Sequence, residues 1–207
     1  SLFDEGRVEL RILEQAHVAD ILLERLELEP KHPPKLQGWK TMVTELKRQK
    51  PSITVGLVGK YVELHDAYLS VREALNHAAL YYGVGVDLKW ISSTDVEKNN
   101  GQDLLAGLDA ILVPGGFGSR GVEGKILAAQ YARENKIPYL GLCLGLQVMM
   151  IEFARNVLGL KEADSAEFDK LTPDPVIDLM LEQRGLDQLG GTMRLGLYPC
   201  HIKHDTK

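Results

Sequence analysis

From residue 53 onward, apolar runs of strand length alternate with segments that have helical periodicity. The predicted strands cover residues 53–58, 84–90, 110–113 and 138–142, and the predicted helices cover residues 66–83, 121–135 and 144–158. Strands that are separated by helices pair in parallel, because the chain needs a crossover to return to the same end of the sheet. The sequence therefore predicts an α/β fold with a doubly wound, mostly parallel sheet and helices on both faces. Ligands of such sheets bind beyond the carboxyl ends of the strands.

The helix after the first strand has start and stop signals of its own. Asp66 is expected to cap its N-terminus, and Gly83 is expected to end it. Its buried stripe is expected to comprise residues three or four apart, namely Tyr68, Val71, Leu75, Ala78 and Tyr82. Further along, residues 163–188 are expected to be irregular, and residues 189–198 are expected to add an edge strand or hairpin.

The first 50 residues are charged and favour helix rather than strand. Residues 18–26 place their apolar side chains near helical spacing. Three prolines then break the pattern, so residues 29–38 are expected to form an extended linker before a second helix at 39–49. The chain is thus expected to contain a helical segment, residues 1–50, and an α/β domain, residues 51–207.

Composition argues against several classes of protein. The formal net charge is −5 and basic residues are interspersed with acidic ones, so no nucleic-acid partner is expected. No apolar run approaches the roughly 20 residues of a membrane helix, and no secretory signal opens the chain, so we expect a cytoplasmic protein without a membrane partner. Neither a disulfide between Cys143 and Cys200 nor a metal site among the scattered histidines is expected.

Cys143 lies in Gly141-Leu-Cys-Leu-Gly145, directly after a predicted strand and directly before a predicted helix. This is the setting of a nucleophile elbow, with cysteine in place of the usual serine. A helix N-terminus favours a thiolate, which is the form of cysteine that attacks carbonyl groups. The pattern predicts a nucleophilic cysteine, and the alternative is a small buried core residue. Cys200 has no such setting and is interpreted as structural.

A glycine-rich segment, Pro114-Gly-Gly-Phe-Gly-Ser-Arg-Gly121, follows the third predicted strand. Backbone N–H groups in such a turn can hold a developing oxyanion, and Gly116 together with Leu144 would supply two donors. Residues 116–121 also match a dinucleotide-binding pattern, but Pro114 interrupts the junction and the next strand lacks an acid for the ribose. A phosphate loop ending at Lys60 is rejected, because Thr54 and Tyr61 occupy two of its required positions.

These motifs resemble those of the class I glutamine amidotransferases, whose nucleophile lies in G-[IVL]-C-L-G-x-Q, here residues 141–147. Within that class, three segments resemble the CTP synthase family and occur in its order: residues 58–68, 114–124 and 190–196. The resemblance is strong over residues 53–200. It implies that residues 1–50 are the tail of a synthetase domain with its linker, and that residues 51–207 are a glutamine amidotransferase domain, incomplete at its C-terminus.

The resemblance also assigns residue roles. It implies that Cys143 is the nucleophile and that Gly116 and Leu144 form the oxyanion hole. The glutamine pocket would be lined by Gly116, Leu144, Gly145, Leu146, Gln147 and Glu167, with the Glu167 carboxylate facing the substrate ammonium. The whole enzyme would aminate UTP to CTP with ATP, Mg²⁺ and glutamine, with GTP as activator and as a homotetramer. No cofactor site is expected in this chain.

The expected general base is missing from the pattern. The family has a His-x-Glu pair on a later strand, whereas no such pair occurs in this sequence, and His201 and His204 are interpreted as surface residues. The chain alone is therefore expected to turn over glutamine poorly or not at all. Two alternatives remain open: a stand-alone α/β cysteine hydrolase, and a non-catalytic assembly module that uses helices such as 121–135.

Overall fold

The computed structural model describes residues 12–30, 32, 35–98, 101–179, 201 and 204. The chain divides into two units. The first comprises residues up to Ser52 together with Leu75–Gly85, and the second comprises Ile53–Ala74 together with residues from Val86 onward. Residues 189–198, which include the motif at 190–196, and Cys200 lie outside the described residues, so the predicted edge strand stays a prediction.

A parallel sheet forms the centre of the second unit. Its strands are β1 (Ser52–Gly59), β2 (Gly85–Ser92), β3 (Ala110–Val113) and β4 (Tyr139–Gly141), in the order β2-β1-β3-β4. β1 pairs with β3 in parallel and β3 pairs with β4 in parallel, as the sequence predicts. The chain moves from β1 to β2 on one side and then returns to β3 on the other. The boundary between β1 and β3 is therefore the switch point at which such sheets bind ligands.

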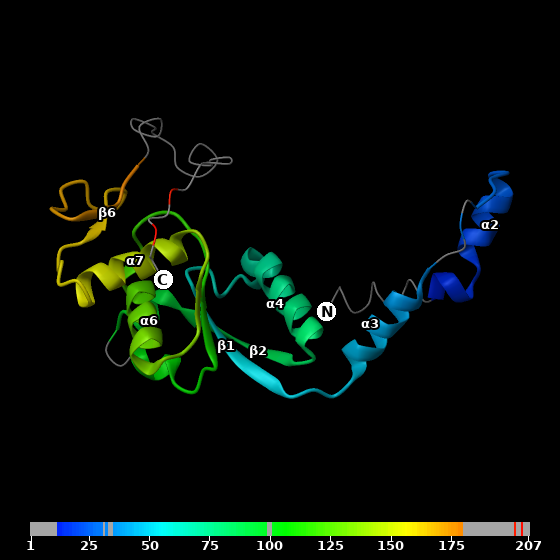
Figure 1. The fold of residues 1–207 in the computed structure, drawn as a ribbon, viewed down its shortest axis with the longest axis horizontal. Helices are drawn as coiled ribbons and strands as arrows, with labels where there is room; N and C mark the ends of the chain where they lie inside the picture. Colours follow the sequence, from blue (N-terminus) through cyan, green and yellow to red (C-terminus); the bar gives the residue numbers. More distant parts are fainter. Residues whose placement is uncertain are drawn as a thin grey trace. The chain divides into compact units, whose positions relative to one another are not determined.

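Two long helices pack on each other and on β3 and β4: α6 (Val122–Asn135) and α7 (Leu144–Asn156) (Figure 1). Their facing side chains are apolar and buried, among them Ile126 and Ile151. Two charged pairs join the two helices, an outer one between Arg155 and Glu123 and a buried one between Arg133 and Glu152. The Arg133 guanidinium donates to the Glu152 carboxylate, with Nη2 2.8 Å from Oε1, and Glu152 is only 1% exposed. Its carboxylate is thus paired, as a buried charge must be.

The helix after β1 differs from its prediction at two points. A 3-10 turn, η1 (His65–Tyr68), precedes α4 (Leu69–Tyr82), and no side-chain hydrogen bond caps that turn. The prediction that Asp66 caps the helix is therefore wrong: Asp66 lies inside the turn, where its carbonyl accepts from the Leu69 N–H. Gly83 does end the helix, with φ +68.

The buried stripe of α4 is only partly as predicted. Tyr68 is buried, but Ala78 is exposed and Tyr82 is 77% exposed. The buried residue near the end of the helix is Ala79, four positions after Leu75 rather than three. With 3.6 residues per turn, either step keeps a residue near the same face, so spacing alone does not choose between Ala78 and Ala79.

Several short elements complete the described part of the second unit. They are α5 (Ser93–Val96), η2 (Gly101–Leu105), β5 (Asp164–Ser165) and β6 (Pro175–Ile177). β5 and β6 pair in parallel, so the expectation of an irregular stretch at 163–188 missed a two-residue ladder. The Arg155 side chain fixes this segment on α7 by donating to the Ala163 carbonyl and the Asp164 carboxylate, at 2.6 and 3.1 Å.

Before residue 50, the first unit contains the helices α2 (Val18–Arg25) and α3 (Gln37–Lys47), which agree with the predicted pair. α2 buries none of its residues, and α3 buries Val43. An ion pair joins Glu14 to Lys40, with 2.8 Å between Oε1 and Nζ. Among the described residues, no helix is long and apolar enough to cross a bilayer.

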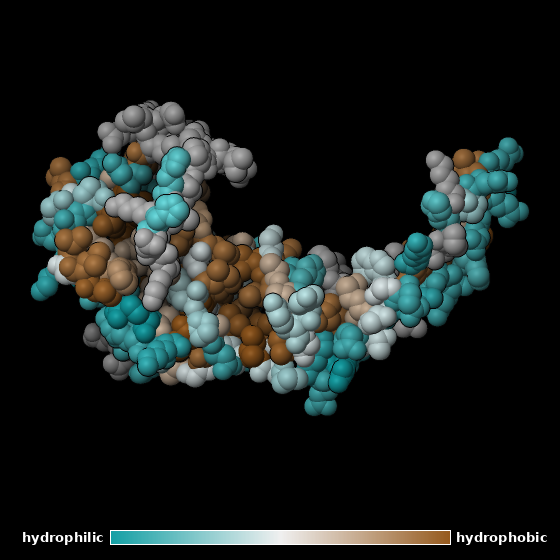
Figure 2. Space-filling model, in the orientation of Figure 1, coloured by the Kyte–Doolittle hydropathy of each residue, from teal (hydrophilic) through white to brown (hydrophobic). Residues whose placement is uncertain are grey.

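The last turns of α7 carry apolar side chains on the outer surface as well as in the core. Figure 2 shows hydrophobic residues gathered around the end of this helix, where Phe153 in the last turn, and Val157 and Leu158 directly after it, are exposed. Ile151 and Ala154, on the other side, are buried. α7 is therefore apolar on more than one side, unlike a helix with one polar face toward water.

Candidate active site

Cys143 stands where β4 bends into α7. It is the N-cap residue of that helix, with φ 54 and ψ −111, and its side chain is exposed. A residue other than glycine in this backbone region is strained, which is typical of nucleophile elbows. The sequence prediction of a sharp strand-to-helix turn at Cys143 agrees with this geometry, and a buried core cysteine does not.

Small residues allow the elbow to close. A Cβ on Gly141 would overlap the Gly145 backbone, and a Cβ on Gly145 would overlap the carbonyl of Val113 in β3. The Tyr139 hydroxyl donates to the Gly145 carbonyl at 2.8 Å and so ties β4 to the first turn of α7. Burial, with a further contribution from Glu152, raises the pKa of Tyr139, so this hydroxyl stays protonated as a donor.

The glycine turn after β3 lies against the cysteine. The position of a Cβ on Gly115 is 3.2 Å from the Cys143 Cβ and 3.6 Å from its Sγ. Within the described part of the chain, the N–H groups of Gly116 and Leu144 make no hydrogen bond, whereas those of Gly145 and Leu146 bond to Leu142 and Cys143. Two backbone donors without a partner among the described residues thus lie next to the residues that meet at this contact, one directly after Gly115 and one directly after Cys143, and an oxyanion hole needs such a pair.

Lys125 is a feature that the sequence prediction missed. It projects from α6, is fully buried, and donates from Nζ to the Pro114 carbonyl at 3.2 Å. Burial and, to a smaller extent, the charge of the nearby Lys60 lower the pKa of Lys125 to about 8, whereas Cys143 acts in the opposite direction. A lysine within the apolar stripe of a helix is the signal that could have revealed it.

The stability of the protein is expected to depend on the titration of Lys125. Its pKa is about 8 in the folded chain and 10.5 when unperturbed, so between these values the unfolded chain binds more protons and stability rises with pH. Lys125→Met removes this dependence. Urea unfolding at pH 7.5 and 9.5 should show wild type gaining stability relative to Lys125→Met. Parallel changes in the two proteins would contradict the assignment, and Lys161→Met, an exposed lysine, serves as control.

Glu167 lies near the glycine turn, since the Gly118 backbone and the Lys60 ammonium both act on the pKa of its carboxylate. Its Oε1 atom is buried and has no hydrogen-bond partner among the described residues. Burial raises the pKa of Glu167, although Gly118 and the Lys60 ammonium favour its charged form. A buried carboxylate oxygen without a donor is costly, so the site is suited to an incoming cation.

The remaining predicted site residues follow Cys143 along α7. Gly145 is buried, Gln147 is half-buried and Leu146 is exposed. His201 and His204 are exposed, as their interpretation as surface residues expects. Lys60, considered in the sequence only as part of a rejected phosphate loop, instead contacts the glycine turn: Nζ donates to the Phe117 carbonyl at 2.6 Å.

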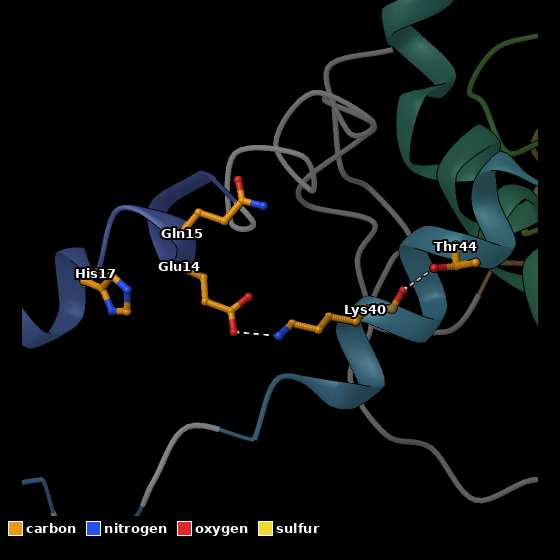
Figure 3. A pocket seen from close by; sticks show the side chains of 5 residues that line it. All are labelled: Glu14, Gln15, His17, Lys40 and Thr44. Atoms are coloured by element: carbon orange, nitrogen blue, oxygen red, sulfur yellow. Dashed lines mark hydrogen bonds and ion pairs between the residues drawn. The ribbon is translucent and has the colours of Figure 1, made fainter.

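A separate pocket of about 440 Å³ lies in the first unit (Figure 3). It is lined by Glu14, Gln15, His17, Lys40 and Thr44, none of which is a predicted site residue. Two of the lining residues, Glu14 and Lys40, form an ion pair, so their opposite charges compensate each other. Within the described ranges, no group of three or more His, Cys, Asp or Glu side chains could hold a metal ion.

Several curated proteins with similar sequences are CTP synthases. The chain is 56% identical over 195 residues to a CTP synthase of Ruminiclostridium cellulolyticum and 53% identical over 195 residues to one of Bacillus velezensis. Each match covers 94% of this chain but 36% of the relative, so the chain spans about a third of the length of these curated relatives.

A solved structure and a family profile agree with these relatives. The glutaminase domain of Trypanosoma brucei CTPS, with bound acivicin, is 42% identical with a TM-score of 0.60, over 64% of this chain and 52% of that one. The profile described as glutamine amidotransferase class-I matches residues 63–207, well over half of the chain. This range contains the elbow, the glycine turn and Glu167. The chain therefore belongs to the class I glutamine amidotransferase family.

Proposed function

We propose that this chain is the glutamine-hydrolysing part of a CTP synthase. The observation that carries the proposal is the exposed, strained Cys143 at the start of α7, beside a glycine turn with an unused N–H group. In this proposal Cys143 is the nucleophile, and Gly116 and Leu144 form the oxyanion hole. The glutamine pocket is lined by Gly116, Leu144, Gly145, Leu146, Gln147 and Glu167.

The reaction proceeds through a thioester. The Cys143 sulfur forms a bond to the side-chain carbonyl carbon of glutamine, and the carbonyl oxygen becomes an oxyanion that accepts from the two backbone N–H groups. The carbon–nitrogen bond then breaks, and the nitrogen leaves as ammonia after taking up the proton released by the thiol. Water attacks the thioester, which frees glutamate and restores the thiol. In the family this proton is carried by the histidine of a His-x-Glu pair, which this sequence lacks.

Glu167 binds the amino group of the substrate. Its buried, unpartnered Oε1 gains a charged donor when an ammonium enters, and such a bond is stronger than one between neutral groups. Because burial raises the pKa of Glu167, the affinity for glutamine falls as pH decreases through that pKa. The backbone donors on one side and the carboxylate on the other match the two polar ends of a glutamine molecule.

In the whole enzyme, the ammonia aminates UTP to CTP with ATP and Mg²⁺, and GTP activates glutamine hydrolysis. Relatives named CTP synthase, which are almost three times as long as the matched region, support this assignment. Residues 1–50 are the tail of the synthetase domain with its linker, and residues 51–207 belong to the amidotransferase domain. We place the enzyme in the cytoplasm as a homotetramer, as the resemblance to CTP synthases implies.

Replacing Glu167 by glutamine should weaken glutamine binding about tenfold to a hundredfold, because one charge-assisted hydrogen bond is lost. The measurement is protection of Cys143 by glutamine against covalent labelling with acivicin, the compound bound in the similar structure. This assay does not need the missing base. Glu162→Gln, which alters an exposed carboxylate, serves as the matched control. Equal protection in Glu167→Gln and wild type would remove Glu167 from the site.

The same assay separates the proposed function from its alternatives. A cysteine hydrolase of another class would be labelled by simple thiol reagents without protection by glutamine. A non-catalytic assembly module would show no difference in reactivity between Cys143 and an ordinary exposed thiol. Protection of Cys143 by glutamine, but not by glycine or by short peptides, supports the amidotransferase pocket.

A further inference from the structure

Lys60 joins the ends of two neighbouring strands at the switch point of the sheet. It follows β1 directly, and its side chain crosses to the glycine turn after β3. The Nζ atom donates to the carbonyls of Phe117 and Gly118, at 2.6 and 3.1 Å. Two of the three donors of the ammonium therefore hold one side of the turn.

These hydrogen bonds to the carbonyl oxygens also fix the direction of the N–H group in the peptide between Phe117 and Gly118. The C=O and the N–H of one planar trans peptide unit point in opposite directions. Because Lys60 holds the carbonyl of Phe117, the N–H of Gly118 in the same peptide unit points away from Lys60, and the Gly118 backbone favours the charged form of Glu167 by lowering its pKa. Gly118 has φ +75, a backbone conformation that favours glycine, and the position of a Cβ there is 3.8 Å from the Lys60 Nζ, an ordinary contact distance.

We propose that Lys60 is a positioning residue that sets the site for the amino group of glutamine, acting through the 117–118 peptide on Glu167. This inference rests on the proposed function, in which Glu167 binds that amino group. Lys60 orders the 117–118 peptide, whose N–H side favours a charged Glu167, and the Oε1 atom of that carboxylate has no partner of its own among the described residues and is free for the substrate. The Cys143 side chain instead lies against Gly115, and Lys125 rather than Lys60 holds the neighbouring Pro114 carbonyl.

Lys60 also has an opposing effect, since its positive charge lies near the place where an ammonium would bind. Lys60 interacts with Glu167 through its charge, and Arg120 adds a second positive charge nearby. These repulsions act at a partly exposed site, where solvent screens them strongly. Two charge-assisted hydrogen bonds to the turn outweigh them, so the loss of Lys60 is expected to weaken binding rather than strengthen it.

The test compares Lys60→Met, which keeps the length of the stem but has no donors, with Lys60→Arg, which keeps charge and donors. Protection of Cys143 by glutamine against acivicin should require about tenfold more glutamine or more in Lys60→Met, and Lys60→Arg should restore most of it. The rate of alkylation of Cys143 by iodoacetamide, which has no amino group, should be unchanged. Lys161→Met controls for removal of an exposed lysine.

Two results would overturn the inference. One is wild-type or better protection in Lys60→Met, which means that only the charge of Lys60 matters. The other is an equal loss of iodoacetamide and acivicin reactivity, which means general disruption of the elbow. Amide hydrogen exchange of residues 115–120 keeps the test independent of glutamine. Exchange at Gly118 should be faster in Lys60→Met, and unchanged exchange would overturn the positioning role even if wild type shows no glutamine protection.

Discussion

Replacement of Cys143 by alanine is expected to abolish covalent labelling of the protein by acivicin, a loss of at least about a thousandfold in rate. Alanine leaves the backbone of the elbow and the contacts of Gly115 in place but removes the only sulfur that faces the glycine turn in the described residues. Mass spectrometry of the intact protein, followed by peptide mapping, measures the modification and its position.

Cys200→Ala provides the matched control, because it removes the second cysteine of the sequence. This variant should be labelled at the wild-type rate and on Cys143 alone. Persistent labelling of Cys143→Ala, or a modification that maps to Cys200, would show that the elbow cysteine is not the reactive nucleophile.

Gly145→Ala should destabilise the fold by about 3 kcal/mol or more. The added methyl group would overlap the carbonyl oxygen of Val113, which belongs to the backbone of a central strand and cannot rotate away. α7 would have to move from β3, and the elbow would open with it. Urea unfolding followed by circular dichroism measures the change.

The matched control is Gly38→Ala in α3, where an added Cβ meets nothing within 4 Å. Alanine favours helix over glycine by up to about 1 kcal/mol, so this variant should be neutral or slightly stabilised. The contrast separates steric overlap from the general effect of replacing glycine. An unfolding midpoint of Gly145→Ala equal to that of wild type would contradict the close packing of α7 on β3.

The sequence predicted those elements whose apolar residues follow one clear repeat, either the alternation of a strand or the 3.6-residue spacing of a helix. The runs at β1 and β3, and the helices α6 and α7, lie where alternation and 3.6-residue spacing predict them. The cysteine elbow was also predictable, since small residues around Cys143 are required by any sharp bend from strand to helix. These features depend on neighbours in the chain, which the sequence displays directly.

The errors and omissions depend on contacts between distant segments. Whether Ala78 or Ala79 faces inward depends on the exact rotation of α4, which spacing does not fix. Lys60 and the carbonyl of Phe117 meet only because β1 and β3 are adjacent in the sheet. Lys125 had one local signal, a lysine in an apolar row, but its partner at Pro114 is defined only by the packing of α6.

A crystal structure of the protein after reaction with acivicin tests the central claim most directly. The account predicts an adduct on the Cys143 sulfur, with the N–H groups of Gly116 and Leu144 directed at it and within about 3.1 Å of an acceptor atom. The amino group of the adduct should contact Glu167. An adduct on another residue, or one on Cys143 with both N–H groups turned away, would contradict the account.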